Sequence, residues 1–298
     1  DVARAYELQG DFVNQSLALN YFSLTQQKLG DWNGASESVT NSLNILNKLN
    51  LNSHESKHVL ALAFNTQGSL LLARGEPEKA IESWQKAVNI YSEINDNTGR
   101  TGSLINKANA YQALGFYRRS VSVFDSVEKH LLSSANSPLK VAGLRRLGNV
   151  LQATGKFDES QKMLKQSLIV AQQLQSASEE SATLLSLGNL YLAKAKTKLP
   201  PNNAIHQNYT PLRCDTITAI SDNAKKDYAQ SLDFYQKSLN KSTSEITKVQ
   251  AQLNILSVPP ELRQKPITQE ITAIKSEIAT LTPSRAAIYD KVKFARNL

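Results

Sequence analysis

The chain has 298 residues and a mass of 32.9 kDa, with 41% apolar and 20% charged residues, which is typical of folded, soluble proteins and excludes a disordered chain. Its longest apolar run is the segment from Val59 to Phe64, far short of the ~18 residues that cross a bilayer, so we expect no membrane contact. The single cysteine, Cys214, excludes an internal disulfide framework and a site built from several thiolates.

The net charge of +8 is unevenly spread: −3 over residues 1–100, +7 over residues 101–200 and +4 over residues 201–298. A basic middle attracts acidic proteins or nucleic acid through long-range fields. However, the Lys and Arg residues are scattered along helical patterns and lack the interleaved aromatic residues of a single-strand binder. Electrostatic nucleic-acid binding is therefore kept as an alternative only.

The first predicted element, residues 1–9, is the tail of a helix, and the chain starts with Asp1 rather than Met. We therefore expect a piece of a longer protein. We also expect it to be soluble, and either cytoplasmic or exported after removal of a leader.

An internal repeat organises the sequence that follows. A small residue recurs every 40 residues, and in the full units a glycine that predicts a turn between two helices follows it by seven positions. The small residues are Gly68, Ala108, Gly148 and Gly188, and the turn glycines are Gly30, Gly75, Gly115 and Gly155.

Each repeat predicts two amphipathic helices that pack closely. The small residue lets the first helix approach the second, where residues such as Trp84 and Phe124 recur between smaller ones at helical spacing. We expect Trp84, Phe124 and Tyr191 to be core residues rather than parts of a cofactor site. Neither helix buries its apolar stripe alone, so consecutive repeats must stack on a continuous core.

These shared positions resemble those of tetratricopeptide-repeat proteins: a small residue, then Tyr or Leu, then Gly on the first half of the unit, and a small–aromatic–small pattern on the second helix. The resemblance implies an all-α, right-handed superhelical solenoid of antiparallel helix pairs. About five units cover residues 12–257, so that residues 1–257 form the solenoid. The spacing here is longer than the 34 residues usual for the family.

The fifth unit is interrupted. About 31 extra residues, which we place at 195–225, separate Tyr191 from the matching second-helix residue Ser231, and Pro200 and Pro201 favour an extended loop. The sequence leaves open whether this insertion is structural or contacts a partner. Residues 258–298 predict further helices that begin another unit.

A narrower resemblance concerns four segments, which are similar to the repeat region before the caspase-like domain of bacterial, largely cyanobacterial, CHAT-domain proteins. The segments are Gln27–Trp32, Leu147–Gly155, Val249–Asn254 and Pro283–Tyr289. This resemblance implies that a C-terminal caspase-like domain of the same full-length chain could be a partner. Proteolytic chemistry in that family belongs to that separate domain, and Cys214 does not replace its catalytic cysteine.

One catalytic-looking motif is the HExxH sequence from His54 to His58. On a helix, the two imidazoles could bind zinc while Glu55 activates a bound water, and Glu78 or Glu82 could supply the third ligand. The motif lies at a surface junction between repeats without an active-site cleft. A zinc metallopeptidase therefore stays an alternative to two exposed histidines at a helix start.

Other catalytic patterns fail. Gly155 and Lys156 lack the spacing of a phosphate-binding loop, and there is no Gly-x-Ser-x-Gly elbow or placed pair of carboxylates. We therefore predict that the chain is not an enzyme and uses no cofactor.

The predicted function is recognition of a peptide or protein segment by the concave face. The resemblance implies that ten first-helix residues line this face: Asn65, Ser69, Asn106, Asn109, Gln112, Arg145, Arg146, Asn149, Gln152 and Asn189. Amides can pair with a peptide backbone and arginines with a carboxylate. Ala142 stands where one clamp lysine is expected, which argues against chaperone-tail binding. Some amides could instead tie adjacent helices together.

Overall fold

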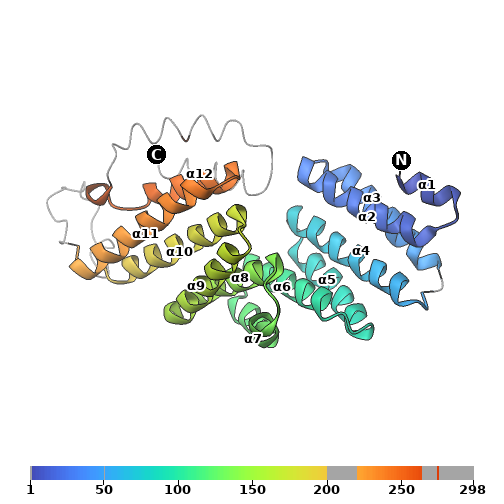
Figure 1. Ribbon diagram of the computed structural model, residues 1–298, viewed down its shortest axis with the longest axis horizontal. Helices are drawn as coiled ribbons and strands as arrows, with labels where there is room; N and C mark the ends of the chain where they lie inside the picture. The colour runs from blue at the N-terminus through green and yellow to red at the C-terminus, as the bar shows by residue number, and fades with distance from the viewer. Residues whose placement is uncertain (1, 50, 200–219, 264–273, 275–298) are drawn as a thin grey trace, which may run out of the picture. The chain divides into compact units, whose positions relative to one another are not determined.

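The computed structural model describes residues 2–49, 51–199, 220–263 and 274. In this part of the chain it contains twelve α-helices, one short 3-10 helix and no β-strand (Figure 1). The chain divides into two compact units, with the boundary between Ala135 and Asn136. In each unit, helices that are consecutive in sequence pack as antiparallel pairs, so the predicted all-α solenoid architecture is confirmed.

The first unit pairs α2 with α3 and α4 with α5, while α6 packs on α5 and α7. The first helices of successive repeats also touch, because α4 contacts both α2 and α6. The helices are α1 (Val2–Leu8), α2 (Phe12–Leu29), α3 (Trp32–Lys48), α4 (His54–Ala73), α5 (Pro77–Glu93), α6 (Asn97–Ala113) and α7 (Tyr117–Ser133).

The second unit pairs α8 with α9 and α10 with α11, and the first helices α8, α10 and α12 contact in sequence order. Its elements are α8 (Pro138–Ala153), α9 (Phe157–Gln173), α10 (Ala177–Thr197), α11 (Asp222–Lys241), α12 (Glu245–Leu256) and the 3-10 helix η1 (Pro260–Leu262). α12 packs on α10 and α11, as the first helix of a next repeat would, although the sequence placed it at the end of the fifth. Most of the predicted insertion (200–219) and most of the predicted C-terminal helices lie outside the described residues.

The turn between the two helices of a repeat uses the predicted glycines. Gly30, Gly75, Gly115 and Gly155 all have φ between 77° and 84°. In each case the N–H of the following residue donates to a carbonyl five residues earlier, for example from Glu76 to Leu71 at 2.9 Å. This bond pattern needs a left-handed residue, which glycine adopts without a Cβ clash.

The small residues of the first helix lie directly against large side chains of the second. A Cβ added at Gly68 would be 2.7 Å from the Trp84 ring, and one added at Gly148 would be 2.6 Å from Leu164. Gly188 meets the ring of Tyr235 in the same way, across the insertion. Trp84 and Phe124 are at most 1% exposed, and Tyr191 is 8% exposed, which confirms their predicted place in the core.

A buried serine joins the paired helices in several repeats. Ser120 donates to the carbonyl of Ala108 at 2.8 Å, and Ser160 donates to that of Gly148 at 2.7 Å. The first repeat reverses the bond: Ser23, on the first helix, donates to the carbonyl of Ala35 on the second at 2.8 Å. Ser23 therefore does not weaken the repeat pattern, because the serine and its small partner have exchanged helices.

The exchanged positions of the serine and the alanine predict that a second substitution restores the stability lost in a first one. Ser23→Ala removes a buried hydrogen bond, so we expect it to lower the free energy of unfolding by about 1 kcal/mol. Adding Ala35→Ser recreates the Ala108/Ser120 arrangement and should recover most of that loss. Urea unfolding of the two single variants and the double variant measures this coupling. Additive losses in the double variant would contradict the interpretation.

Candidate functional site

All ten predicted binding residues are half-buried, and they lie on the first helices α4, α6, α8 and α10. Half-burial is what a groove-lining side chain and a side chain between two helices have in common. Their hydrogen bonds separate these two roles. Because the two units are separate bodies, each face is described by itself.

In the first unit, Asn65 joins two first helices. Its Oδ1 accepts hydrogen bonds from Ser103 Oγ and Asn106 Nδ2, both at 3.3 Å. Its backbone carbonyl accepts from Trp84 Nε1 at 3.2 Å and from Ser69 Oγ at 3.1 Å. Asn65, Ser69 and Asn106 therefore take part in holding α4, α5 and α6 together.

Asn109 and Gln112 lie further along α6 and differ from this group. Their side-chain amides form no hydrogen bond within the part of the chain that the structure describes. These two amides are the predicted residues of the first unit that have donors and acceptors left for a ligand.

In the second unit, two arginines meet one carboxylate. Arg145 Nη2 lies 3.5 Å from Glu179 Oε2, and both side chains are about one-quarter exposed or less. Within the described part of the chain, the buried Nε of Arg145 has no hydrogen-bond partner. Burial, with a smaller effect from Arg145, lowers the pKa of Arg146 to about 10. Arg146 therefore remains a cation at neutral pH.

Asn189 resembles Asn65 in its role. Its Oδ1 accepts from Tyr235 Oη at 2.9 Å and from Asn254 Nδ2 at 2.6 Å, and its backbone carbonyl accepts from Gln152 Nε2 at 3.2 Å. Burial raises the pKa of Tyr235 far above its usual range, which keeps its hydroxyl a donor. Asn189 and Gln152 thus link α8, α10, α11 and α12.

Asn149, on α8, makes no side-chain hydrogen bond to a described residue, as is the case for Asn109 in the first unit. Sequence reasoning missed Glu179, Tyr235 and Asn254, which complete these networks. Glu179 follows Arg145 by 34 residues and could have been noticed as the opposite charge on the next first helix. The contact of Tyr235 with Asn189 could not have been found in this way, because the insertion shifts the second helix of this repeat out of the 40-residue spacing.

The HExxH motif forms the first turns of α4. His54 Nε2 is 3.2 Å from the carbonyl of Ile94, and His58 Nδ1 is 3.3 Å from Asp96 Oδ2, so both rings contact the α5–α6 junction. Glu78 and Glu82 lie near the start of α5, whereas the motif meets its other end. Among the described residues, no three His, Cys, Asp or Glu side chains are grouped to hold a metal ion.

Two further sequence features can be compared with the structure. None of the described helices combines the length and the apolar character needed to span a membrane. Cys214 lies outside the described residues.

Comparisons with known proteins agree with this geometry. A tetratricopeptide repeat model matches residues 143–174, which cover most of α8 and all of α9. A comparison with curated proteins finds no match.

Several solved structures share the fold. Nearly identical TPR-like repeats from Podosopora anserina superpose with a TM-score of 0.54 at 17% identity, over 76% of this chain and 98% of that one. The quorum sensor NprR of B. thuringiensis superposes with a TM-score of 0.61 at 14% identity, over 98% of this chain and 73% of that one. NprR in complex with its cognate peptide NprX gives 0.59 at 16% identity, over 99% and 75%. The chain therefore carries a tetratricopeptide repeat at residues 143–174 and has the helical-solenoid fold of tetratricopeptide-repeat structures.

Proposed function

We propose that the chain is a protein-interaction scaffold whose first-helix faces bind an extended peptide segment that carries a carboxylate. The observation that supports this most directly is the division among the ten predicted residues. Asn109, Gln112 and Asn149 are half-buried amides whose side chains form no hydrogen bond to a described residue, so their donors and acceptors are available to a ligand.

The charge of the second unit supports the carboxylate. Arg145 on α8 pairs with Glu179 at 3.5 Å, and its buried Nε donates to no described residue. A carboxylate of the ligand would accept from the Arg145 guanidinium through charge-assisted hydrogen bonds, which are about twice as strong as neutral ones. The structural neighbour NprR was solved in complex with its cognate peptide, which supports a peptide as the class of ligand.

The proposal does not depend on catalysis. His54 and His58 are oriented towards the α5–α6 junction, and Glu78 and Glu82 are remote from them, so the geometry does not favour the metallopeptidase alternative. The sequence resemblance also predicts that this chain is a recognition module for a caspase-like domain, and this stays a prediction.

The free amides predict a loss of binding without a loss of stability. Peptides selected from a displayed random library against this chain provide the ligand, and fluorescence anisotropy measures the affinity. We expect Asn149→Ala to weaken binding about fivefold, because one hydrogen bond is worth about 1 kcal/mol. The midpoint of urea unfolding should not change.

The matched control is Gln166→Ala, which removes a half-buried amide from the second helix α9. It should change neither affinity nor stability. If the Asn149 and Gln166 variants bind the selected peptides as tightly as the parent, the first-helix face of the second unit is not the binding surface.

An amide that is already hydrogen-bonded within the chain, such as Asn189, predicts the opposite behaviour, which is a loss of stability. Asn189→Ala leaves the deeply buried Tyr235 hydroxyl without its acceptor, so we expect the free energy of unfolding to fall by about 1–3 kcal/mol. Urea unfolding measures the free energies of unfolding of Asn189→Ala and Asn149→Ala under the same conditions, so that the two losses can be compared. Equal stability of the two variants would show that the distinction between network and free amides is wrong.

The pairing of Arg145 with Glu179 predicts an effect of Glu179 on binding. Glu179→Gln frees Arg145 for the ligand while keeping an oxygen near it, so peptides with a free carboxylate should bind several-fold more tightly. The same peptides with an amidated C-terminus and no acidic residue should show no gain. A gain for both kinds of peptide, or for neither, would argue against recognition of a carboxylate.

A further inference from the structure

Two buried polar side chains on the adjacent first helices α2 and α4 lack a bonding partner. Asn20 is 0% exposed and Thr66 is 1% exposed. The Nδ2 and Oδ1 atoms of Asn20 and the Oγ1 atom of Thr66 make no hydrogen bond within the part of the chain that the structure describes. Folded proteins pair nearly all of their buried polar atoms, because an unpaired one is costly. These two side chains therefore call for a partner.

The packing of α2 on α4 brings Asn20 and Thr66 to the same level of the fold. Leu17 of α2 packs on the apolar cluster that contains Ala63 of α4. Asn20 and Thr66 each follow these residues by three positions, which is about one helical turn. The two first helices contact each other and run in the same direction, since each is antiparallel to the second helix between them. Asn20 and Thr66 thus belong to the next turn of one interface.

The next pair of first helices, α4 and α6, satisfies the same position with side chains. Asn65 is the counterpart of Asn20 in the following repeat, 45 residues later. Its Oδ1 accepts from Ser103 Oγ and from Asn106 Nδ2 of α6, both at 3.3 Å. An asparagine at this repeat position is therefore completed by two donors of the next first helix.

Both donors are replaced at the contact between α2 and α4. Ala63 stands at the repeat position of Ser103, and Thr66 stands at that of Asn106, 40 residues earlier in each case. Ala63 has no hydroxyl, and the hydroxyl of Thr66 ends one bond closer to the backbone than the amide nitrogen of Asn106. The side chains that face Asn20 are consequently smaller and do not reach its carbonyl oxygen.

We propose that a buried water molecule bridges Asn20 and Thr66 and completes the interface between α2 and α4. The water donates to Asn20 Oδ1, as the two α6 side chains do to Asn65, and it accepts from the Thr66 hydroxyl. A buried water needs about two to four polar partners, and the amide and the hydroxyl together offer enough of them. This site goes beyond the proposed function, because its residues are closed to a peptide.

A high-resolution crystal structure of the whole chain tests the proposal directly. We expect an ordered water peak within hydrogen-bond distance of both Asn20 and Thr66. The double variant Ala63→Ser, Thr66→Asn rebuilds the arrangement of Ser103 and Asn106. We expect this variant to lose the water peak, because its own side chains donate to Asn20.

Urea unfolding tests whether the two residues are linked in energy. Thr66→Val keeps the shape of the side chain but removes the hydroxyl, so we expect the equilibrium constant for unfolding to rise about fivefold. In the Asn20→Leu background the same substitution should no longer destabilise the chain, because no amide is left for the water to join to Thr66. Circular dichroism checks that each variant keeps the helicity of the parent.

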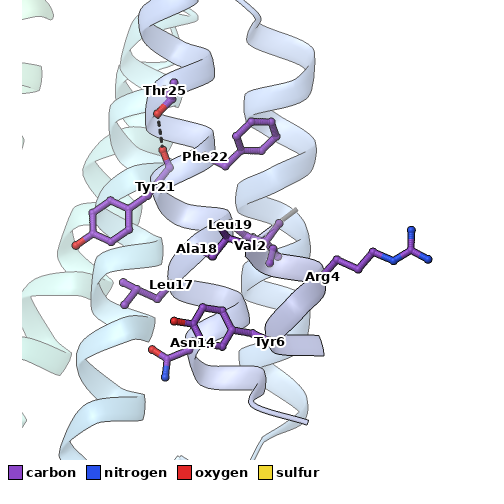
Figure 2. Close-up of a pocket in the computed structure, with 11 residues that line it drawn as sticks. Val2, Arg4, Tyr6, Asn14, Leu17, Ala18, Leu19, Tyr21, Phe22 and Thr25 are labelled. Atoms are coloured by element: carbon purple, nitrogen blue, oxygen red, sulfur yellow. Dashed lines mark hydrogen bonds between the residues drawn. The ribbon is translucent and has the colours of Figure 1, made fainter. Parts of the chain in front are cut away.

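The matched control is Thr25→Val, on another face of α2. Thr25 is exposed, lines a pocket between α1 and α2, and donates to the Tyr21 carbonyl of its own helix at 3.0 Å (Figure 2). Its hydroxyl joins no second helix, so we expect the equilibrium constant for unfolding to stay that of the parent.

Two results would overturn the proposal. One is a parent crystal structure in which Asn20 and Thr66 bond to each other directly, or in which no water lies between them. The other is a loss of stability from Thr66→Val that is the same in the parent and in the Asn20→Leu background.

Discussion

The close approach of two helices at a small residue is the contact on which every repeat of this chain depends. At Gly68, Gly148 and Gly188 the large side chain of the second helix occupies the volume that a Cβ would need. The approach is close enough for a serine or the Trp84 indole to reach a backbone carbonyl of the facing helix. Apolar contact and the buried hydrogen bond therefore have one geometric cause.

The fold was predictable because its determinants recur. A small residue, a turn glycine and a large second-helix residue at fixed spacing indicate helix pairs even where single positions vary. Ser23 seemed to depart from the pattern, but its bond to Ala35 preserves the contact with the donor on the other helix. The role of α12 as the first helix of a further repeat was harder to predict from the sequence, because the long interruption before α11 obscures the count of repeats.

The candidate site was predictable only in part. The repeat positions gave ten polar residues, which are half-buried in the structure, but they did not indicate which of these residues are already hydrogen-bonded within the chain. Asn189 and Asn149 look alike in sequence, and the difference between them arises from Tyr235 and Asn254, which lie 46 and 65 residues away from Asn189. Long-range partners of this kind depend on packing across helices, which local pattern does not encode.

The interchangeable direction of the buried serine bond also constrains how such repeats can be shuffled during evolution. A first helix with Ser23 needs a small residue on its second helix, whereas a first helix with Ala108 or Gly148 is matched to a serine there. Recombination that joins halves of opposite type leaves either two hydroxyls or none at this contact. The second repeat, with Gly68 facing Ala80, has no serine there and uses the bond from the Trp84 indole to the Asn65 carbonyl instead. Whole helix pairs, rather than single helices, are therefore the modules that keep this bond when they are duplicated or exchanged.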